Sequence, residues 1–132
     1  MEREIKNEKV SPRDCIESFL MYDRDVPEVN AKLDECEGTK ICSNPCIELW
    51  FLLHSQDQKS CLSSAECVKT LQNSAREWTR YKKGELSATQ RNLLWENRSA
   101  AIERAKELTE GKNPSTGVYK LLESVERSLL RV

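Results

Sequence analysis

Apolar and amphipathic stretches alternate along the first third of the chain. An apolar run over 15–22 predicts a strand, and apolar positions at helical spacing over 26–37 predict a helix that stops at Gly38. A second short strand is predicted over 39–42. Two strands joined by a helix normally lie parallel with a right-handed crossover. The pattern therefore predicts an α/β fold with a small parallel sheet, in which both strands end at the same edge.

The chain after the second strand has mainly helical periodicity. Pro45 suits the first position of a helix, and this helix is expected to cover the apolar residues up to His54. Capping-box sequences at 63–66 and 87–90 predict the starts of two further helices. These segments predict a helical carboxyl-terminal section packed against the sheet.

The pattern also predicts where the last helices begin and end. The helix that starts at the later capping box is expected to reach about Gly111, and a final helix is expected from about Pro114 or Ser115. We expect one domain over 1–132, made of a loose arm over 1–13, a βαβ-helix core over 14–54 and a helical section over 55–132.

Composition narrows the class of protein. The length fits one domain, and a formal net charge of -1 gives no overall basic footprint for nucleic acid. A nuclease remains compatible with this charge, because a metal and a local basic strip can hold a phosphate. No apolar run is long enough to span a membrane and the first nine residues are too polar for a secretory signal, so we expect a cytoplasmic protein. The six cysteines include no Cys-x-x-Cys pair and are expected to be reduced structural thiols.

Two aspartates follow the first predicted strand. Asp23 and Asp25 are separated by one residue, so they share a face where ligands gather in α/β proteins. Carboxylate oxygens suit Mg²⁺ or Mn²⁺, which keep several waters and take one or two protein carboxylates. We expect these aspartates to hold such a cation for phosphodiester hydrolysis. The spacing alone is equally compatible with two solubilising residues in a turn.

Three further polar residues have two interpretations each. Glu48 either stabilises the amino-terminal turn of its helix or acts as a third catalytic carboxylate. Asn44, before a proline, either contacts phosphate or holds its turn. His54 lies at the end of an apolar helix, where we expect a half-buried core histidine rather than a metal ligand.

One cluster combines basic and aromatic residues. Trp78 and Tyr81 are interleaved with four cations, and this pattern is typical of proteins that stack bases and contact phosphates of single-stranded nucleic acid. The alternative is a solvated helix end with Trp78 packed in the core. The predicted nucleic-acid-binding cations are Arg76, Arg80, Lys82 and Lys83.

Three segments carry a resemblance to a known family. The run over 19–25 that contains both aspartates, the Ser-Asn-Pro segment with the following helix over 41–54, and the Asn-Pro-Ser-Thr segment over 113–121 resemble the RloB-like (abortive-infection AbiLii-type) family. The resemblance covers roughly residues 19–122. It implies a Toprim-related fold and a metal-dependent nuclease of bacterial phage defence that works beside an ATPase partner.

The chain departs from the pattern that this resemblance implies. Toprim enzymes carry a catalytic glutamate on an earlier strand, and only 22 residues precede Asp23, most of them too polar for that strand. We therefore expect an incomplete Toprim-like sheet, in a fragment, a short relative, or a chain whose site another chain completes. Whether the chain is active alone stays open at this point.

The sequence thus supports two functions. The first is a Mg²⁺- or Mn²⁺-dependent nuclease, or a nuclease-derived subunit of a phage-defence system, acting on RNA or DNA. The second is a non-enzymatic interaction module that binds an ATPase partner or itself. An open sheet edge recruits other chains, so we expect a homodimer or a stable complex.

Overall fold

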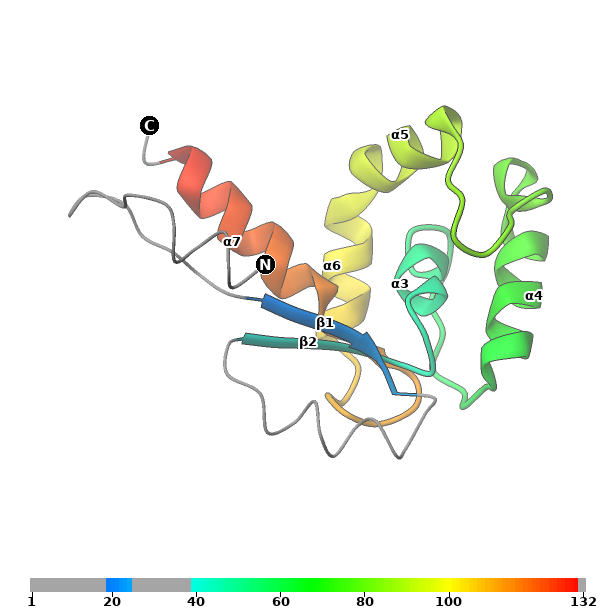
Figure 1. Ribbon diagram of the computed structural model, residues 1–132, viewed down its shortest axis with the longest axis horizontal. Coiled ribbons are helices and arrows are strands. Elements are labelled where there is room, and N and C mark those ends of the chain that lie inside the picture. The colour runs from blue at the N-terminus through cyan, green and yellow to red at the C-terminus, as the bar shows by residue number, and fades with distance from the viewer. Residues whose placement is uncertain (1–18, 25–38, 131–132) are drawn as a thin grey trace, which may run out of the picture.

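A computed structural model describes residues 19–24 and 39–130 of the chain (Figure 1). The expected loose arm and the expected helix over 26–37 lie outside these residues. The elements are β1 Phe19–Asp23, β2 Thr39–Asn44, α3 Glu48–Leu52, α4 Ser64–Ser74, the 3-10 helix η1 Arg76–Trp78, α5 Ala88–Glu96, α6 Arg98–Lys106, β3 Ser115–Thr116 and α7 Val118–Leu130.

The described strands form one sheet in the order β1-β2-β3. β1 and β2 are parallel, with Asp23 opposite Ser43, so the predicted parallel pair is confirmed. β3 is antiparallel to β2 and pairs Thr116 with Ser43. The sheet is therefore mixed rather than purely parallel, and the α/β class is confirmed. The short third strand brings the carboxyl-terminal part of the chain to the edge at which β1 and β2 end.

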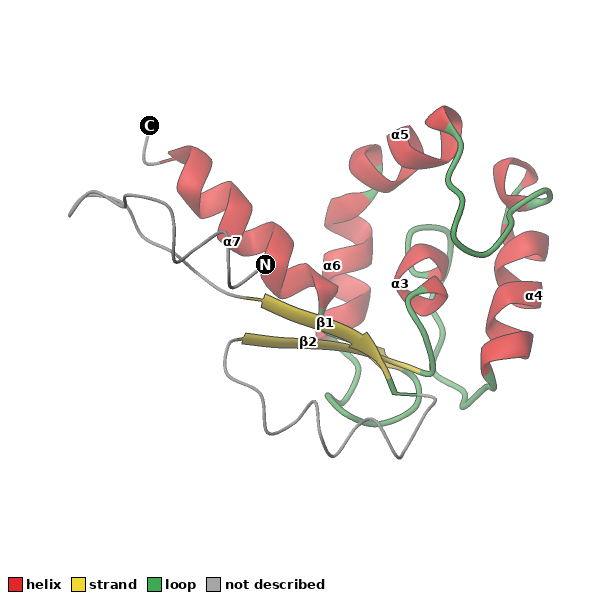
Figure 2. Cartoon of the chain, in the orientation of Figure 1, coloured by secondary structure: helices red, strands yellow, loops and turns green. Residues whose placement is uncertain are grey.

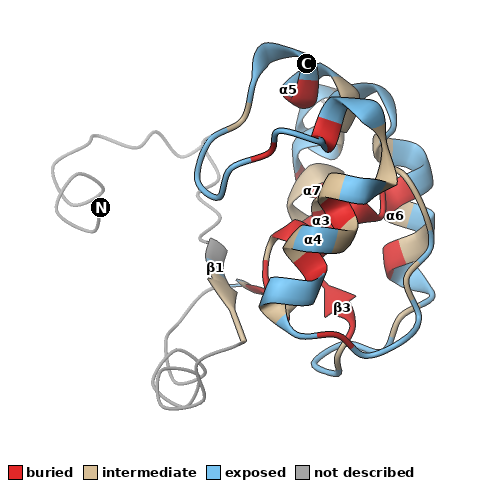
Figure 3. Ribbon diagram, turned by 90° about the vertical axis from the view of Figure 1, so that its right-hand side faces the viewer, coloured by how far each residue is buried: buried red, intermediate tan, exposed pale blue. Residues whose placement is uncertain are grey.

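The helix α3 is the centre of the hydrophobic core. In the views of Figures 1 and 2, α3, α6 and α7 lie on one side of the sheet and α4 packs beyond α3. Leu49 and Leu52 face a cluster shared with α4, whereas Trp50 and Leu53 face a cluster shared with β2, α6 and α7. A helix that is apolar on both sides is buried, and Figure 3 shows buried residues concentrated around α3.

Local sequence signals predicted some helix ends and missed others. Both capping boxes are formed: Ser63 exchanges hydrogen bonds with Glu66, and Ser87 with Gln90. The helix expected from Pro45 begins only at Glu48.

The two expected carboxyl-terminal helices have different bounds from those predicted. The helix expected to reach Gly111 is divided at Asn97, whose side-chain amide donates to the carbonyl of Leu93 and competes with the helical backbone. The final helix begins at Val118, because Ser115 and Thr116 pair with β2.

Membrane insertion receives no support from the helices. Within the ranges that the structure describes, no helix is long and apolar enough to cross a bilayer.

Candidate functional site at the carboxyl edge of the sheet

Three segments meet where β1 and β2 end. The hydroxyl oxygens of Ser43 and Thr116 lie 2.7 Å apart in a buried hydrogen bond. The side-chain amide of Asn44 donates to the carbonyl of Gly111 at 3.2 Å. The Ser-Asn-Pro and Asn-Pro-Ser-Thr segments are therefore cross-strand neighbours. No periodicity in the sequence links these two segments, and the Asn-Pro pattern that they share is the one signal that could have done so.

Asp23 occupies the predicted position at the end of β1. Its carboxylate oxygen Oδ1 accepts a hydrogen bond of 3.0 Å from the backbone N–H of Ile47, and its side chain is half-buried. This bond joins β1 to the turn that precedes α3 and fixes the direction of the carboxylate. A role for Asp23 in metal binding stays a prediction, and Asp25 lies outside the described residues.

Asp23 and Asn44 carry side-chain oxygen atoms at this edge, and such oxygens suit Mg²⁺ or Mn²⁺ better than zinc. The hydroxyl of Ser43 is buried and bonded to that of Thr116. In the part of the chain that is described, no three His, Cys, Asp or Glu residues are grouped to hold a metal.

Glu48 is buried at the start of α3. Its side chain is 1% exposed, and Oε2 accepts a hydrogen bond of 2.6 Å from the hydroxyl of Tyr81. Burial and this carboxylate raise the pKa of the Tyr81 phenol. The other oxygen, Oε1, has no hydrogen-bond partner among the described residues. The pairing of Glu48 with Tyr81 could not be predicted from the sequence, because residues so far apart along the chain carry no local signal of contact.

Buried thiols lie near both acids. A hydrogen bond to Cys46, burial and the negative charges of Glu48 and Asp23 together raise the pKa of the Cys67 thiol. A protonated thiol is a poor metal ligand. Cys42, Cys46 and Cys67 are buried free cysteines, whereas Cys61 is free and exposed. Cys15 and Cys36 lie outside the described ranges.

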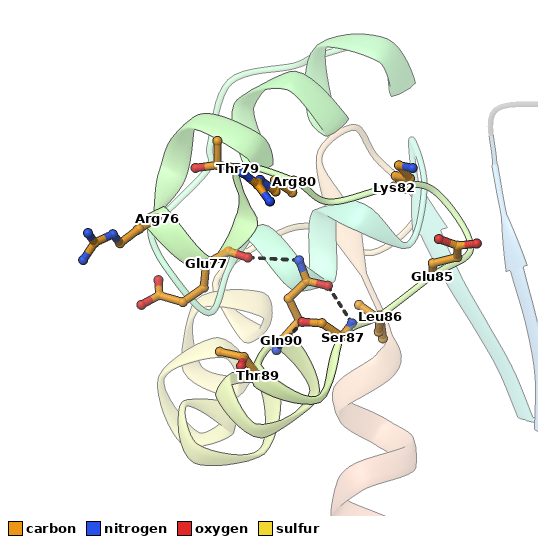
Figure 4. Close-up of a pocket in the computed structure, with 10 residues that line it drawn as sticks. All are labelled: Arg76, Glu77, Thr79, Arg80, Lys82, Glu85, Leu86, Ser87, Thr89 and Gln90. Atoms are coloured by element: carbon orange, nitrogen blue, oxygen red, sulfur yellow. Dashed lines mark hydrogen bonds between the residues drawn. The ribbon is translucent and has the colours of Figure 1, made fainter.

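The basic strip lines a cleft between η1 and the start of α5. Arg76, Arg80 and Lys82 line this cleft of about 750 Å³ with hydroxyl groups and two glutamates (Figure 4). Trp78 and Tyr81 are 1% and 3% exposed, so of the two interpretations the one in which they stack on bases does not hold. Both rings pack in the core cluster beside α4, as the alternative interpretation had it for Trp78. Lys83 faces a different cavity.

His54 is a buried core residue, as expected. Its Nδ1 lies 2.8 Å from the carbonyl oxygen of Trp50, so Nδ1 carries the proton and donates. Its Nε2 is without a hydrogen-bond partner in the described part of the chain. Burial is the main cause that lowers the pKa of His54 below its usual value near 6.5. The ring is therefore neutral in the folded protein.

This burial predicts a loss of stability in mild acid. The unfolded chain binds a proton near pH 6.5 whereas the folded chain does not, so stability is full above that pH and falls as the pH drops below it. The loss is at most about 1.4 kcal/mol per pH unit. Urea unfolding between about pH 7.5 and 5.5 measures it. The chain has one histidine, so His54→Gln should flatten this part of the profile. An imidazole that titrates at or above its usual pKa by NMR would contradict the prediction.

Comparison with known proteins places this site in a family. No curated protein and no solved structure matches the chain. A family model described as RloB-like protein matches residues 3–125, a range that includes Asp23, the basic cleft and most of α7. With nearly the whole sequence matched, the chain belongs to the RloB-like protein family.

Proposed function

We propose that this RloB-like chain carries the cation site of a Mg²⁺- or Mn²⁺-dependent nuclease in phage defence. The observation that carries the proposal is the position of Asp23, which ends β1 beside Ser43 and has its carboxylate fixed by the N–H of Ile47. Asp25 is proposed as the second ligand. The Toprim relationship and the defence role come from the resemblance noted above and belong to the proposal.

The bound cation would polarise a phosphodiester oxygen and activate water. Asp23 would hold the cation in one direction, because its second contact to the Ile47 backbone limits rotation of the carboxylate. Glu48 is a weaker candidate for the metal, since Tyr81 already donates to its carboxylate in the core. Asn44 is a weaker candidate for phosphate binding, because its side-chain amide already donates to the carbonyl of Gly111 in a distant loop.

The basic cleft would hold the nucleic-acid backbone. Arg76, Arg80 and Lys82 are exposed and line one concave surface. Cations of this kind bind phosphates without reading sequence. Since the two aromatic rings of the strip are buried, contact in this cleft would be mainly electrostatic and would weaken with salt.

The direct test is cleavage of nucleic acid by the purified chain. Single-stranded RNA, single-stranded DNA and duplex DNA are incubated with Mg²⁺ or Mn²⁺, with Ca²⁺, or with EDTA. We expect cleavage with Mg²⁺ or Mn²⁺ that EDTA abolishes. The same preparation of Asp23→Asn controls for contaminating nucleases. Products that persist in EDTA, or that Asp23→Asn forms equally well, would contradict the proposal.

A second candidate is an interaction module for an ATPase partner or a second copy. Val125 and Leu129 on α7 are 44% and 64% exposed, which is unusual for large apolar side chains on one helix. Light scattering over a range of concentrations separates the candidates. A chain that cleaves nothing and forms a stable oligomer would favour the module over the nuclease.

A further inference from the structure

A second cavity lies between the start of α3 and the segment 81–86. Its volume is about 460 Å³, within the usual range for small-molecule sites. One of its walls is Ile47, whose backbone is bonded to Asp23. The cavity is therefore next to the proposed cation site. The residues that line it differ from the proposed metal ligands. The side chains that define it are Ile47, Phe51, Leu86, Glu48, Lys83 and Arg91.

A buried acid faces this cavity with one oxygen unsatisfied. Glu48 is 1% exposed, Tyr81 occupies Oε2, and Oε1 has no partner among the residues described. A buried polar oxygen without a hydrogen-bond partner is costly. A ligand that donates an N–H to Oε1 would remove this cost, so the acid selects for a donor at the bottom of the cavity.

An aromatic stack forms another wall. The half-buried Phe51 ring stacks on the buried Trp78 ring, with centroids 5.7 Å apart and an interplanar angle of 12°. Tyr81 packs against Phe51 edge to face at 6.0 Å. Phe51 is therefore the accessible end of a rigid stack, and a planar ring can extend it.

The rim of the cavity carries two cations and one exposed carboxylate, that of Glu85. Lys83 and Arg91 are both exposed, and Arg91 is oriented by a hydrogen bond of 2.6 Å from its guanidinium to the carbonyl of Leu86. A guanidinium and an ammonium beside an apolar cavity suit a phosphate. Together the walls offer an acceptor, a stacking surface and two cations, which are the complements of a nucleobase and its phosphate.

Access to the acid depends on the turn over 82–85. The N–H of Glu85 donates to the carbonyl of Lys82 at 3.0 Å, and Gly84 has φ +87, as a type II turn requires at that position. Oε1 itself is covered by protein atoms. All four residues of the turn are exposed, so the turn can shift and let a base reach the acid without unfolding the core.

We propose that this cavity binds one nucleotide, with the base stacked on Phe51, a base N–H donated to Glu48, and the phosphate held by Lys83 and Arg91. The inference rests on the proposed function, because it makes the occupant a nucleotide of the strand that is cut at the adjacent cation site. It also gives Glu48 and Lys83 a role outside the metal site and outside the basic cleft.

The test is the binding of mononucleotides in EDTA, measured by calorimetry and by NMR of the backbone amides. The probes are GMP, AMP, CMP and UMP, with ribose 5-phosphate and inorganic phosphate as probes that lack the base. We expect shifts at residues that line the cavity and an affinity for at least one nucleotide that exceeds that for ribose 5-phosphate by about tenfold or more, because stacking and the base N–H are lost without the base. Equal binding of all phosphates would overturn the proposal.

Matched variants locate the site. Lys83→Ala should weaken the binding of the nucleotide by about fivefold or more, the size expected for loss of a charge-assisted contact. Lys69→Ala removes the same charge from an exposed position on α4 outside both cavities and should change nothing. Glu48→Gln keeps an acceptor for Tyr81, and we expect it to change the order of base preference. Equal effects of the two lysine variants, or an unchanged order of bases with a folded Glu48→Gln, would contradict the assignment.

The same experiment separates this inference from the nuclease proposal. Because EDTA removes the cation, Asp23→Asn should bind the nucleotide as well as the parent chain does. Nucleotide binding without any cleavage would keep the cavity assignment and remove the nuclease. Chelator-sensitive cleavage without nucleotide binding in the cavity would keep the nuclease proposal and remove the cavity assignment.

Discussion

Replacing Asp23 by asparagine is expected to lower chelator-sensitive cleavage by more than about 100-fold, since even the outer partners of metal ligands are worth about 10- to 100-fold. The fold should survive, because asparagine keeps the Oδ1 that accepts the N–H of Ile47. The variant therefore removes a charge and leaves a hydrogen bond in place. Calorimetric titration with Mn²⁺ should lose its signal in parallel with the activity.

Asp23→Ala is the matched variant for this prediction. It removes both the charge and the bond to Ile47, so it should lose stability as well as activity. The loss expected for one hydrogen bond to a charged group is about 1.5 to 3 kcal/mol. If Asp23→Asn keeps full Mn²⁺ binding while Asp23→Ala only destabilises the chain, Asp23 is a structural anchor of the α3 turn and the cation site is elsewhere.

Signals confined to a few neighbouring residues were read correctly from the sequence. The capping boxes at Ser63 and Ser87 each involve residues three apart, so the sequence alone marks where these helices begin. The end of β1 at Asp23 followed from an apolar run that stops at a carboxylate. The parallel pairing of β1 with β2 was predicted because two strands joined by a helix normally lie parallel.

Features that depend on distant residues were not predictable in this way. Ser115 and Thr116 have no periodicity that marks them as a strand, and they become one only because β2 offers its backbone. Trp78 and Tyr81 lie among cations in the sequence, but α3 and α4 bury both rings. The charge pattern of a segment indicates which residues stay at the surface. It does not indicate whether an aromatic side chain among them points into the core, because that depends on elements distant in the sequence.

The candidate site likewise combines features that the local sequence predicted with contacts between distant segments that it did not. The strand pattern predicted Asp23 at the sheet edge, and the charge pattern predicted one basic strip of four cations. Three of them, Arg76, Arg80 and Lys82, line one cleft, whereas Lys83 lines a different cavity. The partners Ile47 of Asp23 and Tyr81 of Glu48 come from segments 24 and 33 residues away. Those contacts show that Glu48 is a buried acid beside a cavity, and its role as a third catalytic carboxylate stays a prediction.

Emptying the core at Trp50 is expected to cost the domain about 3 to 5 kcal/mol, the usual range for removal of a buried aromatic side chain. Trp50 is 5% exposed and packs in the cluster that joins the sheet to α6 and α7. Its ring also meets His54 edge to face, with centroids 4.7 Å apart. α3 carries both core clusters, so a cavity at Trp50 loosens the turn that Asp23 holds.

Trp95 provides the matched control for this last prediction. It is 52% exposed on α5, and its main contact is the guanidinium of Arg98, 3.6 Å from the ring centroid. Trp95→Ala should therefore cost no more than about 1 kcal/mol, the value of an exposed cation–π contact. Urea unfolding followed by far-UV circular dichroism measures both variants. Similar losses for Trp50→Ala and Trp95→Ala would mean that α3 is not the element that holds the sheet and the helices together.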